Sequence, residues 1–250
     1  MPSHILVVGG TKGIGRAVAR RLAADDHDVS VVGRSQPAGD LDRQRTKSWA
    51  ADVTDRPRLL ATLADIVQVQ GPVSGAVLLQ RFRGAGDDWA GEIDTSLTAT
   101  RNLIEWASEH FEDRGRGKAI VVVSSIASGL VASEQPVSYH VAKAAMSHMV
   151  RYYAVSLGSR GIRINAVCPG TIVKEESKAF YAEHPDIERL YGEIVPLGRM
   201  GTAEDVAHLS AFLLSDGASF LTGQNIVLDG GVSLQSPESL SRRITGTGVR

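Results

Sequence analysis

The stretch ILVVGGTKGIG, residues 5–15, decides the fold of this chain. Its first four residues are aliphatic and predict a buried strand, and the glycines after them predict a tight turn into a helix. Such a glycine loop lets the backbone approach a pyrophosphate, which binds at the positive N-terminal end of the following helix. The alternative is a plain strand–helix turn. Because the glycine loop lies in the first βαβ unit, this alternative is the weaker interpretation.

Short apolar runs alternate with helical patterns along the rest of the chain. The predicted strands are residues 5–8, 29–32, 48–51, 73–79, 119–123, 162–167 and 225–228. The predicted helices are residues 13–24, 56–69, 89–110, 137–157 and 203–214. Strands that are apolar throughout predict a parallel sheet that is covered on both faces. We therefore expect an α/β fold in a single domain, with a doubly wound, mostly parallel seven-stranded sheet of the Rossmann type.

Three segments depart from this rhythm. Residues 34–47 hold Pro37, Gly39 and several charges, and predict a loop or one helical turn. Residues 171–199 predict a mobile polar insertion with short helices, which would serve as a substrate lid. Residues 236–250 lack an apolar pattern and are expected to form a tail, partly disordered beyond about Leu240. The domain itself is expected to span residues 1–235.

The composition excludes several classes of protein. A chain of 250 residues suits one α/β domain with a substantial core. The formal net charge of −1 gives no global basic surface for nucleic acid, and no apolar run approaches the roughly 20 residues of a membrane span. The single cysteine, Cys168, permits no internal disulfide, and it is expected to be a small buried side chain. With no leader pattern at the N-terminus, we expect a cytoplasmic protein without a bound metal.

The spacing Gly9-x-x-x-Gly13-x-Gly15 resembles the TGxxxGxG motif of the short-chain dehydrogenase/reductase family, with Val8 in place of the usual threonine. Further family motifs follow in the same order from residue 5 to about residue 231. These motifs are Asp52-Val53, Ser125, Tyr139-x-x-x-Lys143, Asn165 with Pro169-Gly170, Leu221-Thr222-Gly223-Gln224 and Asp229-Gly230-Gly231. The resemblance implies an NADP-binding domain and an oxidoreductase of a carbonyl and a secondary alcohol.

The end of the second predicted strand indicates which dinucleotide would bind. An acid there would bind a ribose 2′-hydroxyl, whereas a basic residue accommodates a 2′-phosphate. Here the strand is followed by Arg34, and Lys12 adds a second cation on the same side. We therefore predict NADP(H), which the resemblance also implies; the alternative is two solvated surface charges. The predicted cofactor contacts are Gly9, Thr11, Lys12, Gly13, Ile14, Gly15, Arg34, Asp52, Val53, Gln80, Tyr139, Lys143, Pro169, Gly170 and Ile172.

Tyr139 and Lys143 are four residues apart on a predicted helix, so their side chains share one face. A neighbouring ammonium favours the phenolate form of a tyrosine, so Tyr139 could exchange a proton with a carbonyl oxygen. Ser125, at the end of its strand, could polarise the same oxygen. The resemblance implies that these three residues are catalytic and that Lys143 also binds the nicotinamide ribose.

Two positions depart from the family pattern. Gln80-Arg81-Phe82-Arg83 replaces the Asn-Asn-Ala-Gly that follows the fourth strand, and Ser96 falls where the family has a catalytic asparagine. In the family this asparagine supports a water relay to the lysine, and serine is shorter with one polar atom. Ser96 is thus a fourth candidate catalytic residue. Two other functions stay open: a cofactor-binding sensor or structural protein with little turnover, and a dehydration or epimerisation on the same scaffold.

Arg81 and Arg83 follow a predicted strand at its carboxyl end, where ligands bind in doubly wound sheets. Arginine offers five donors in a planar fork that suits phosphate or carboxylate. With Lys174 of the lid and Ser125, they are the predicted substrate contacts. They predict a small anionic substrate, such as a phosphorylated or nucleotide-linked sugar or a keto acid. The alternative is that both arginines only hold the loop by pairing with a nearby acid: Asp87, Asp88 or Glu92.

The long predicted helices 89–110 and 137–157 are expected to form an interface between copies of the chain. The second helix carries more apolar positions than one buried face requires, namely Met146, Met149, Val150, Tyr152 and Tyr153. The resemblance implies a homotetramer or a homodimer.

Overall fold

The computed structural model describes residues 3–36, 41–42, 44–84, 87–112 and 117–247. Within these residues, seven parallel strands form one sheet in the order β3-β2-β1-β4-β5-β6-β9. The strands are β1 (His4–Val8), β2 (Asp28–Gly33), β3 (Thr46–Ala50), β4 (Gly75–Leu78), β5 (Ala119–Val123), β6 (Arg163–Pro169) and β9 (Asn225–Leu228). The chain crosses from one half of the sheet to the other between β1 and β4, which makes this the switch point of a doubly wound fold. The predicted fold class is confirmed.

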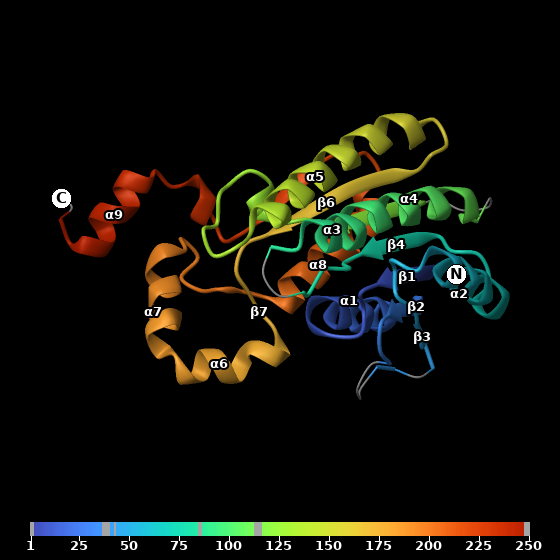
Figure 1. Ribbon diagram of the computed structural model, residues 1–250, viewed down its shortest axis with the longest axis horizontal. Helices are drawn as coiled ribbons and strands as arrows, with labels where there is room; N and C mark the ends of the chain where they lie inside the picture. Colours follow the sequence, from blue (N-terminus) through green and yellow to red (C-terminus); the bar gives the residue numbers. More distant parts are fainter. Residues whose placement is uncertain (1–2, 37–40, 43, 85–86, 113–116, 248–250) are drawn as a thin grey trace.

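Helices cover both faces of the sheet (Figure 1). The helices are α1 (Gly13–Ala24), α2 (Arg56–Gln70), α4 (Ala99–His110), α5 (Val137–Gly158) and α8 (Ala203–Leu214). One core cluster joins the sheet to α2, α4 and α5, and a second joins it to α1 and α8. Each fully buried aliphatic side chain in these clusters stabilises the fold by about 1.5–3 kcal/mol relative to exposure.

The predicted helix 89–110 is not a regular α-helix. It begins as α3 (Trp89–Glu92), continues as a π-helical turn (Ile93–Thr98) and ends as α4. Asp88 caps its start, because its Oδ1 accepts the backbone N–H of Gly91 at 2.9 Å. A π-helical turn accommodates one extra residue and often lies at a functional site. Ser96 lies within this turn.

Some element boundaries differ from the sequence expectation. Strand β3 begins two residues earlier, at Thr46, and β6 continues to Pro169 because both lie beside a neighbouring strand in register. Strand β4 begins at Gly75, since Val73 forms only an isolated bridge with Phe111. No helix forms in the described part of residues 34–47, while Pro37 and Gly39 lie outside the described residues.

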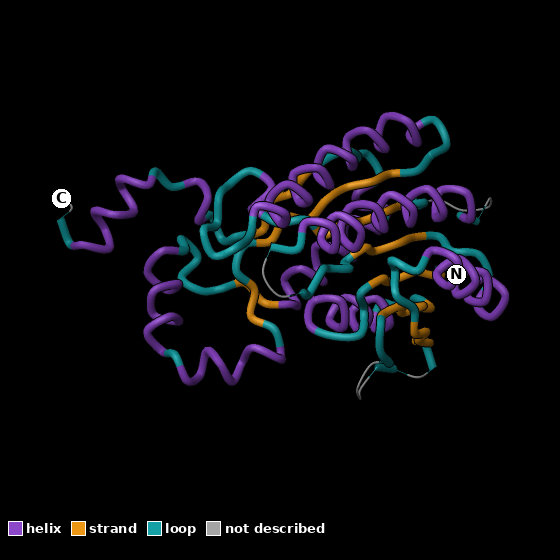
Figure 2. Tube along the Cα trace, in the orientation of Figure 1, coloured by secondary structure: helices purple, strands orange, loops and turns teal. Residues whose placement is uncertain are grey.

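The predicted lid contains short helices, as expected. A two-stranded sheet of β7 (Ile172–Val173) and β8 (Gly201–Thr202) closes its base. Helices α6 (Lys178–Glu183) and α7 (Pro185–Ile194) extend between them and stand apart from the main sheet (Figure 2). The insertion therefore joins the body of the protein beside β6, at the carboxyl end of the sheet.

The tail is more ordered than its composition predicted. Helix α9 (Pro237–Thr245) follows Ser236, and the Arg243 side chain donates to the Ile194 carbonyl at 3.2 Å and to Gln235 at 2.6 Å. These contacts tie the helix to the end of α7. The expectation of disorder beyond Leu240 is thus wrong as far as Thr245, and residues 248–250 lie outside the described range.

Candidate functional site

Two adjoining cavities, of about 160 and 450 Å³, open at the carboxyl end of the sheet. They meet at Gly9, Lys12 and the segment that follows β4. This is the crevice in which ligands bind to doubly wound sheets. We refer to them as the smaller cavity, which contains Ser125, Tyr139 and Lys143, and the larger cavity, which contains Arg34 and Asp52.

The glycine loop between β1 and α1 is tight, as predicted. Gly9 has φ +85°, and a Cβ atom there would lie 2.8 Å from the backbone nitrogen of Gln80. Its own N–H donates to the Val32 carbonyl at 2.7 Å, which ties the loop to β2. The first turn of α1 contains no acidic residue of its own, which favours an anion at its N-terminus.

A carboxylate of the lid lies at this helix terminus. Oε1 of Glu176 accepts the backbone N–H of Gly13 at 3.0 Å and contacts Arg16 Nη2 at 3.4 Å. Lys174 lies over the same turn, because a Cβ atom on Gly13 would be 3.3 Å from its side chain. Gly13 therefore lines neither of the two cavities, although the sequence predicted it as a cofactor contact.

Exposed cations stand at the mouth of the larger cavity. Lys12 and Arg34 both line it and are solvent-accessible. Asp52 faces them, and its Oδ1 accepts the backbone N–H of Thr54 at 3.0 Å and the Thr54 hydroxyl at 2.8 Å. These hydrogen bonds, helped by the charge of Arg34, lower the pKa of Asp52 and keep it ionised. Val53 and Thr11 complete the predicted contacts on this side.

Gln80 lies between the cavity and the core. Its side chain is 6% exposed, and Nε2 donates to the Thr100 hydroxyl at 2.6 Å. Oε1 of Gln80 is buried without a partner among the described residues. An unpaired buried acceptor costs about 1–3 kcal/mol, so this oxygen is a local source of instability in the wall of the larger cavity.

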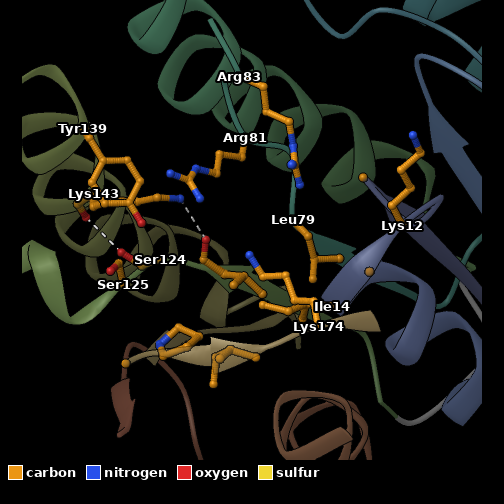
Figure 3. Close-up of a pocket in the computed structure, with 16 residues that line it drawn as sticks. Lys12, Ile14, Leu79, Arg81, Arg83, Ser124, Ser125, Tyr139, Lys143 and Lys174 are labelled. Carbon is orange, nitrogen blue, oxygen red and sulfur yellow. Dashed lines mark hydrogen bonds between the residues drawn. The ribbon is translucent and has the colours of Figure 1, made fainter. Parts of the chain in front are cut away.

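Three of the four sequence-predicted catalytic residues, Ser125, Tyr139 and Lys143, meet in the smaller cavity (Figure 3). Ser125 follows the end of β5, and its Oγ accepts the Ala127 N–H at 3.1 Å. Lys143 Nζ lies 5.6 Å from the ring centroid of Tyr139, and Arg81 Cζ lies 5.1 Å from it. Two cationic side chains therefore lie beside one phenol ring.

Lys143 is a buried ammonium, 3% exposed. Its Nζ donates to the Val123 carbonyl at 3.2 Å and lies 3.7 Å from the sulfur of Met146. Burial lowers the pKa of Lys143 to about 8; the Glu92 carboxylate acts in the opposite direction, and the positive charge of Arg81 lowers it further. Lys143 is therefore poised to change its protonation near the pH of an ordinary assay.

Arg81 and Arg83 from the segment after β4 and Lys174 from the segment after β7 converge on the smaller cavity (Figure 3). Burial lowers the pKa of Lys174, and the charges of both arginines lower it further, which shows that the three groups share one field. Arg81 donates to the Gln135 amide oxygen at 3.2 Å. Among the described residues, neither arginine forms an ion pair with Asp87, Asp88 or Glu92, so the loop-holding alternative is not what the structure shows.

Ser96 does not reach either cavity. It is fully buried, and its hydroxyl donates to Oε1 of Glu92, a carboxylate that is itself only 4% exposed. The sequence treated Glu92 only as a possible ion-pair partner. The signal that could have found it is its spacing, since an acid four residues before Ser96 lies on the same helical face.

The remaining predicted residues are placed as follows. Pro169, Gly170 and Ile172 line the smaller cavity beside Ile14 and Gly15. Asn165 instead links β6 to the loop before β9, with Nδ2 donating to Leu221 O at 2.9 Å and Oδ1 accepting from Gln224 N at 3.0 Å. Cys168 is buried, as expected.

The described residues include no group of three or more His, Cys, Asp or Glu side chains arranged to hold a metal ion. None of their helices has the length and apolar character that crossing a bilayer requires.

Comparisons with known proteins agree with this geometry. Residues 8–233 match the family model described as enoyl-(acyl carrier protein) reductase. The 3-oxoacyl-(acyl-carrier-protein) reductase FabG of Staphylococcus aureus is 32% identical, over 93% of this chain and 98% of that protein. An L-rhamnose 1-dehydrogenase (NAD(P)(+)) of Azotobacter vinelandii is also 32% identical, over 91% of this chain and 95% of that protein.

A solved structure extends this similarity to three dimensions. The structure of ElxO with NADP bound matches with a TM-score of 0.81 and 26% identity, over 94% of this chain and 100% of that chain. The family model covers nearly the whole sheet, from the end of β1 past β9. The chain therefore belongs to the classical short-chain dehydrogenase/reductase family, whose members are oxidoreductases of carbonyl and alcohol groups.

Proposed function

We propose that this chain is an NADP(H)-dependent oxidoreductase that interconverts a carbonyl and a secondary alcohol on a small anionic substrate. The observation that carries this proposal is the meeting of Ser125, Tyr139 and Lys143 in a cavity that adjoins the glycine loop. A nicotinamide cofactor supplies or accepts the hydride when it is bound. The chain's own residues bind and orient the substrate and transfer the proton.

The larger cavity fits a dinucleotide with a 2′-phosphate. The N-terminus of α1 accepts the pyrophosphate, and Lys12 and Arg34 are placed for the additional phosphate. NADP bound to the similar ElxO supports this choice, whereas the name of the similar rhamnose dehydrogenase allows either dinucleotide.

The smaller cavity holds the groups that transfer the proton. Ser125 polarises the carbonyl oxygen and Tyr139 donates the proton to it, with the reverse transfers in alcohol oxidation. Lys143 and Arg81 stabilise the phenolate that remains. Ser124, whose hydroxyl lies 3.0 Å from the Lys143 carbonyl and 3.0 Å from the Ser147 hydroxyl, holds α5 against β5 and so fixes these distances.

The charge of the smaller cavity supports an anionic substrate. Arg81, Arg83 and Lys174 lie together without a described ion-pair partner, and the Glu176 carboxylate nearby offsets only part of their mutual repulsion. Their planar or point charges suit a phosphate or carboxylate. A phosphorylated or nucleotide-linked sugar or a keto acid meets this requirement.

Turnover of matched ketones tests the proposal. We expect NADPH consumption with a ketone that carries a phosphate or carboxylate and much slower consumption with its neutral analogue. Arg81→Ala and Arg83→Ala, made separately, should raise KM for the anionic ketone at least about tenfold in one case. Arg101→Ala is the matched control, since Arg101 is an exposed partner of Glu105 on α4, away from both cavities.

NADPH affinity separates the substrate site from the cofactor site. It should be unchanged in both arginine variants and can be followed by fluorescence titration. Unchanged KM in both variants, or equal activity on the neutral and anionic ketones, would show that the substrate is not recognised by its charge. Binding of NADPH without consumption of any ketone would favour a cofactor-binding protein with little turnover.

Location and assembly also remain proposals. We place the protein in the cytoplasm, as expected from its sequence. The outer face of α5 exposes Tyr152 and Val155, 65% and 85% accessible, while Met146 and Val150 are buried in the core. These exposed apolar side chains fit an interface with a second copy. Light scattering at micromolar concentration that gives the mass of a monomer would contradict it.

A further inference from the structure

Glu92 is a buried carboxylate in a place that the proposed reaction does not yet explain. It is 4% exposed at the end of α3, and the Ser96 hydroxyl donates a hydrogen bond to its Oε1. Within the described residues, no lysine, arginine or histidine forms an ion pair with it. A buried charge is costly unless another charge or several hydrogen bonds compensate it. One hydroxyl is not enough.

A positive charge that can compensate the Glu92 carboxylate lies on the neighbouring helix α5. Helix α5 packs against both α3 and the π-helical turn, and it carries the buried ammonium of Lys143. Lys143 likewise has no ion-pair partner among the described residues, because its contacts are the Val123 carbonyl and the Met146 sulfur. Two opposite buried charges on neighbouring helices therefore stand in each other's field.

The other charged or titratable groups that face Lys143 are few. Arg81 reaches the same cavity and disfavours the ammonium, and the buried thiol of Cys168 favours it weakly. Tyr139 lies beside Lys143 on α5. Burial is the largest influence and lowers the pKa of Lys143, and Glu92 is the main group that opposes it. Glu92 is thus the carboxylate on which the charge of this ammonium depends.

A hydrogen-bonded chain fixes the position of the carboxylate. The Ser96 carbonyl accepts the Thr100 hydroxyl at 2.5 Å, and that hydroxyl accepts a hydrogen bond from Gln80 Nε2 at 2.6 Å. Ser96 is therefore held on both sides, by Glu92 through its hydroxyl and by Thr100 through its carbonyl. The π-helical turn that contains Ser96 connects the carboxylate to the wall of the larger cavity.

We propose that Glu92 is a positioning residue for proton transfer, which acts through Lys143 by keeping its buried ammonium charged beside Tyr139. Ser96 assists by orienting the carboxylate. This inference rests on the proposed oxidoreductase function. Loss of the negative charge leaves burial and Arg81 unopposed, so Lys143 loses its proton at a lower pH. A neutral amine cannot stabilise the phenolate of Tyr139, and turnover then falls.

Glu92→Gln tests this, because glutamine keeps an oxygen that can accept the Ser96 hydroxyl while it removes the charge. We expect the basic limb of kcat for ketone reduction to move to lower pH by on the order of one unit. Near pH 6, where Lys143 stays protonated in both proteins, kcat should approach that of the unmodified enzyme. Ser96→Ala should move the limb in the same direction by less. Glu109→Gln, an exposed change of equal charge on α4, should leave the profile in place.

The apparent values of such a profile belong to the Tyr139–Lys143 pair, so a direct measurement of Lys143 accompanies it. The NMR titration of its side-chain Cε resonance, assigned by its loss in Lys143→Met, should shift to lower pH in Glu92→Gln. This readout needs no turnover. A Lys143 titration that does not move overturns the inference, and so does an equal loss of kcat at every pH. An unmodified protein without turnover would contradict the proposed function alone.

Discussion

The two cavities are built from the same edge of the sheet in different ways. The larger cavity is lined mainly by loops at the ends of strands: the glycine loop, the end of β2, the turn after β3 and the segment after β4. The smaller cavity shares the glycine loop and the segment after β4, and adds residues of α5 and Lys174. Loops that follow apolar strands depend on local sequence. A cavity that also needs α5 depends on how a distant helix packs against the sheet.

The two cavities also differ in charge. The larger cavity mixes cations with the carboxylates of Asp52 and Asp94. No described carboxylate lines the smaller cavity, where the charged side chains are Lys12, Arg81, Arg83, Lys143 and Lys174. The counter-charge for Lys143 lies behind the wall, on Glu92. The open face of the smaller cavity is thus left positive for an anionic ligand.

Removal of the phenolic oxygen of Tyr139 should have the largest effect, because it affects catalysis in the smaller cavity and leaves cofactor binding in the larger cavity intact. In Tyr139→Phe we expect kcat to fall on the order of a thousandfold, because the proton donor is lost while the ring still packs. NADPH affinity by fluorescence titration should stay within about twofold, since the glycine loop and Lys143 are intact. Tyr152→Phe, an exposed change on the same helix, should retain full activity. A Tyr139→Phe variant that keeps most of its kcat would contradict the role of this tyrosine.

Substitutions in the larger cavity should change the preference between the two dinucleotides. Arg34→Asp combined with Lys12→Ala should narrow or reverse a preference for NADPH, by about tenfold to a hundredfold in the ratio of kcat/KM. The cause is the loss of both cations that face the 2′-phosphate. Arg58→Ala removes an exposed charge elsewhere and should leave the ratio unchanged. Equal kcat/KM for NADPH and NADH in the unmodified protein would remove the basis of the prediction.

The sequence predicted the larger cavity better than the smaller one. The strands that flank Gly9 and Arg34 are apolar and contiguous, so both the sheet and this cavity followed from local patterns. Tyr139 and Lys143 also followed, because their spacing is helical. The influence that we propose for Glu92 on Lys143 did not, because the two residues are brought near each other only by the packing of α5 on α3.

Three further differences have the same physical origin. Ser96 was placed by its position in a motif, but a π-helical turn buries it away from both cavities. Gly13 was expected to contact the cofactor, but Glu176 of the lid accepts its N–H. Helix α9 was missed because a few tertiary hydrogen bonds from Arg243 stabilise a segment without a core-facing pattern. In each case a residue distant in sequence decides the outcome.

Glu176 lies outside both cavities, and its substitution should give the smallest of the expected effects. Its carboxylate lies at the N-terminus of α1, where the pyrophosphate of a dinucleotide is expected to bind. Although burial acts to raise the pKa of Glu176, hydrogen bonds from backbone N–H groups and the charges of Arg16 and Arg83 lower it overall. The group is therefore ionised at neutral pH. A carboxylate and a pyrophosphate cannot both accept the same N–H, so the lid must give up this contact when the cofactor binds.

Glu176→Gln should strengthen NADPH binding by about twofold to fivefold, since a charge at a helix terminus is worth about 0.3–1 kcal/mol. The Kd from fluorescence titration measures this, and the difference should shrink at high salt, where the field of an exposed carboxylate is screened. Glu175→Gln is the matched control, because the neighbouring carboxylate pairs with Lys178 at 2.7 Å and does not touch the glycine loop. If Glu175→Gln strengthens binding equally, the gain comes from net charge and not from the contact with Gly13. Weaker binding in Glu176→Gln would mean that this carboxylate holds the lid in the conformation that receives the cofactor.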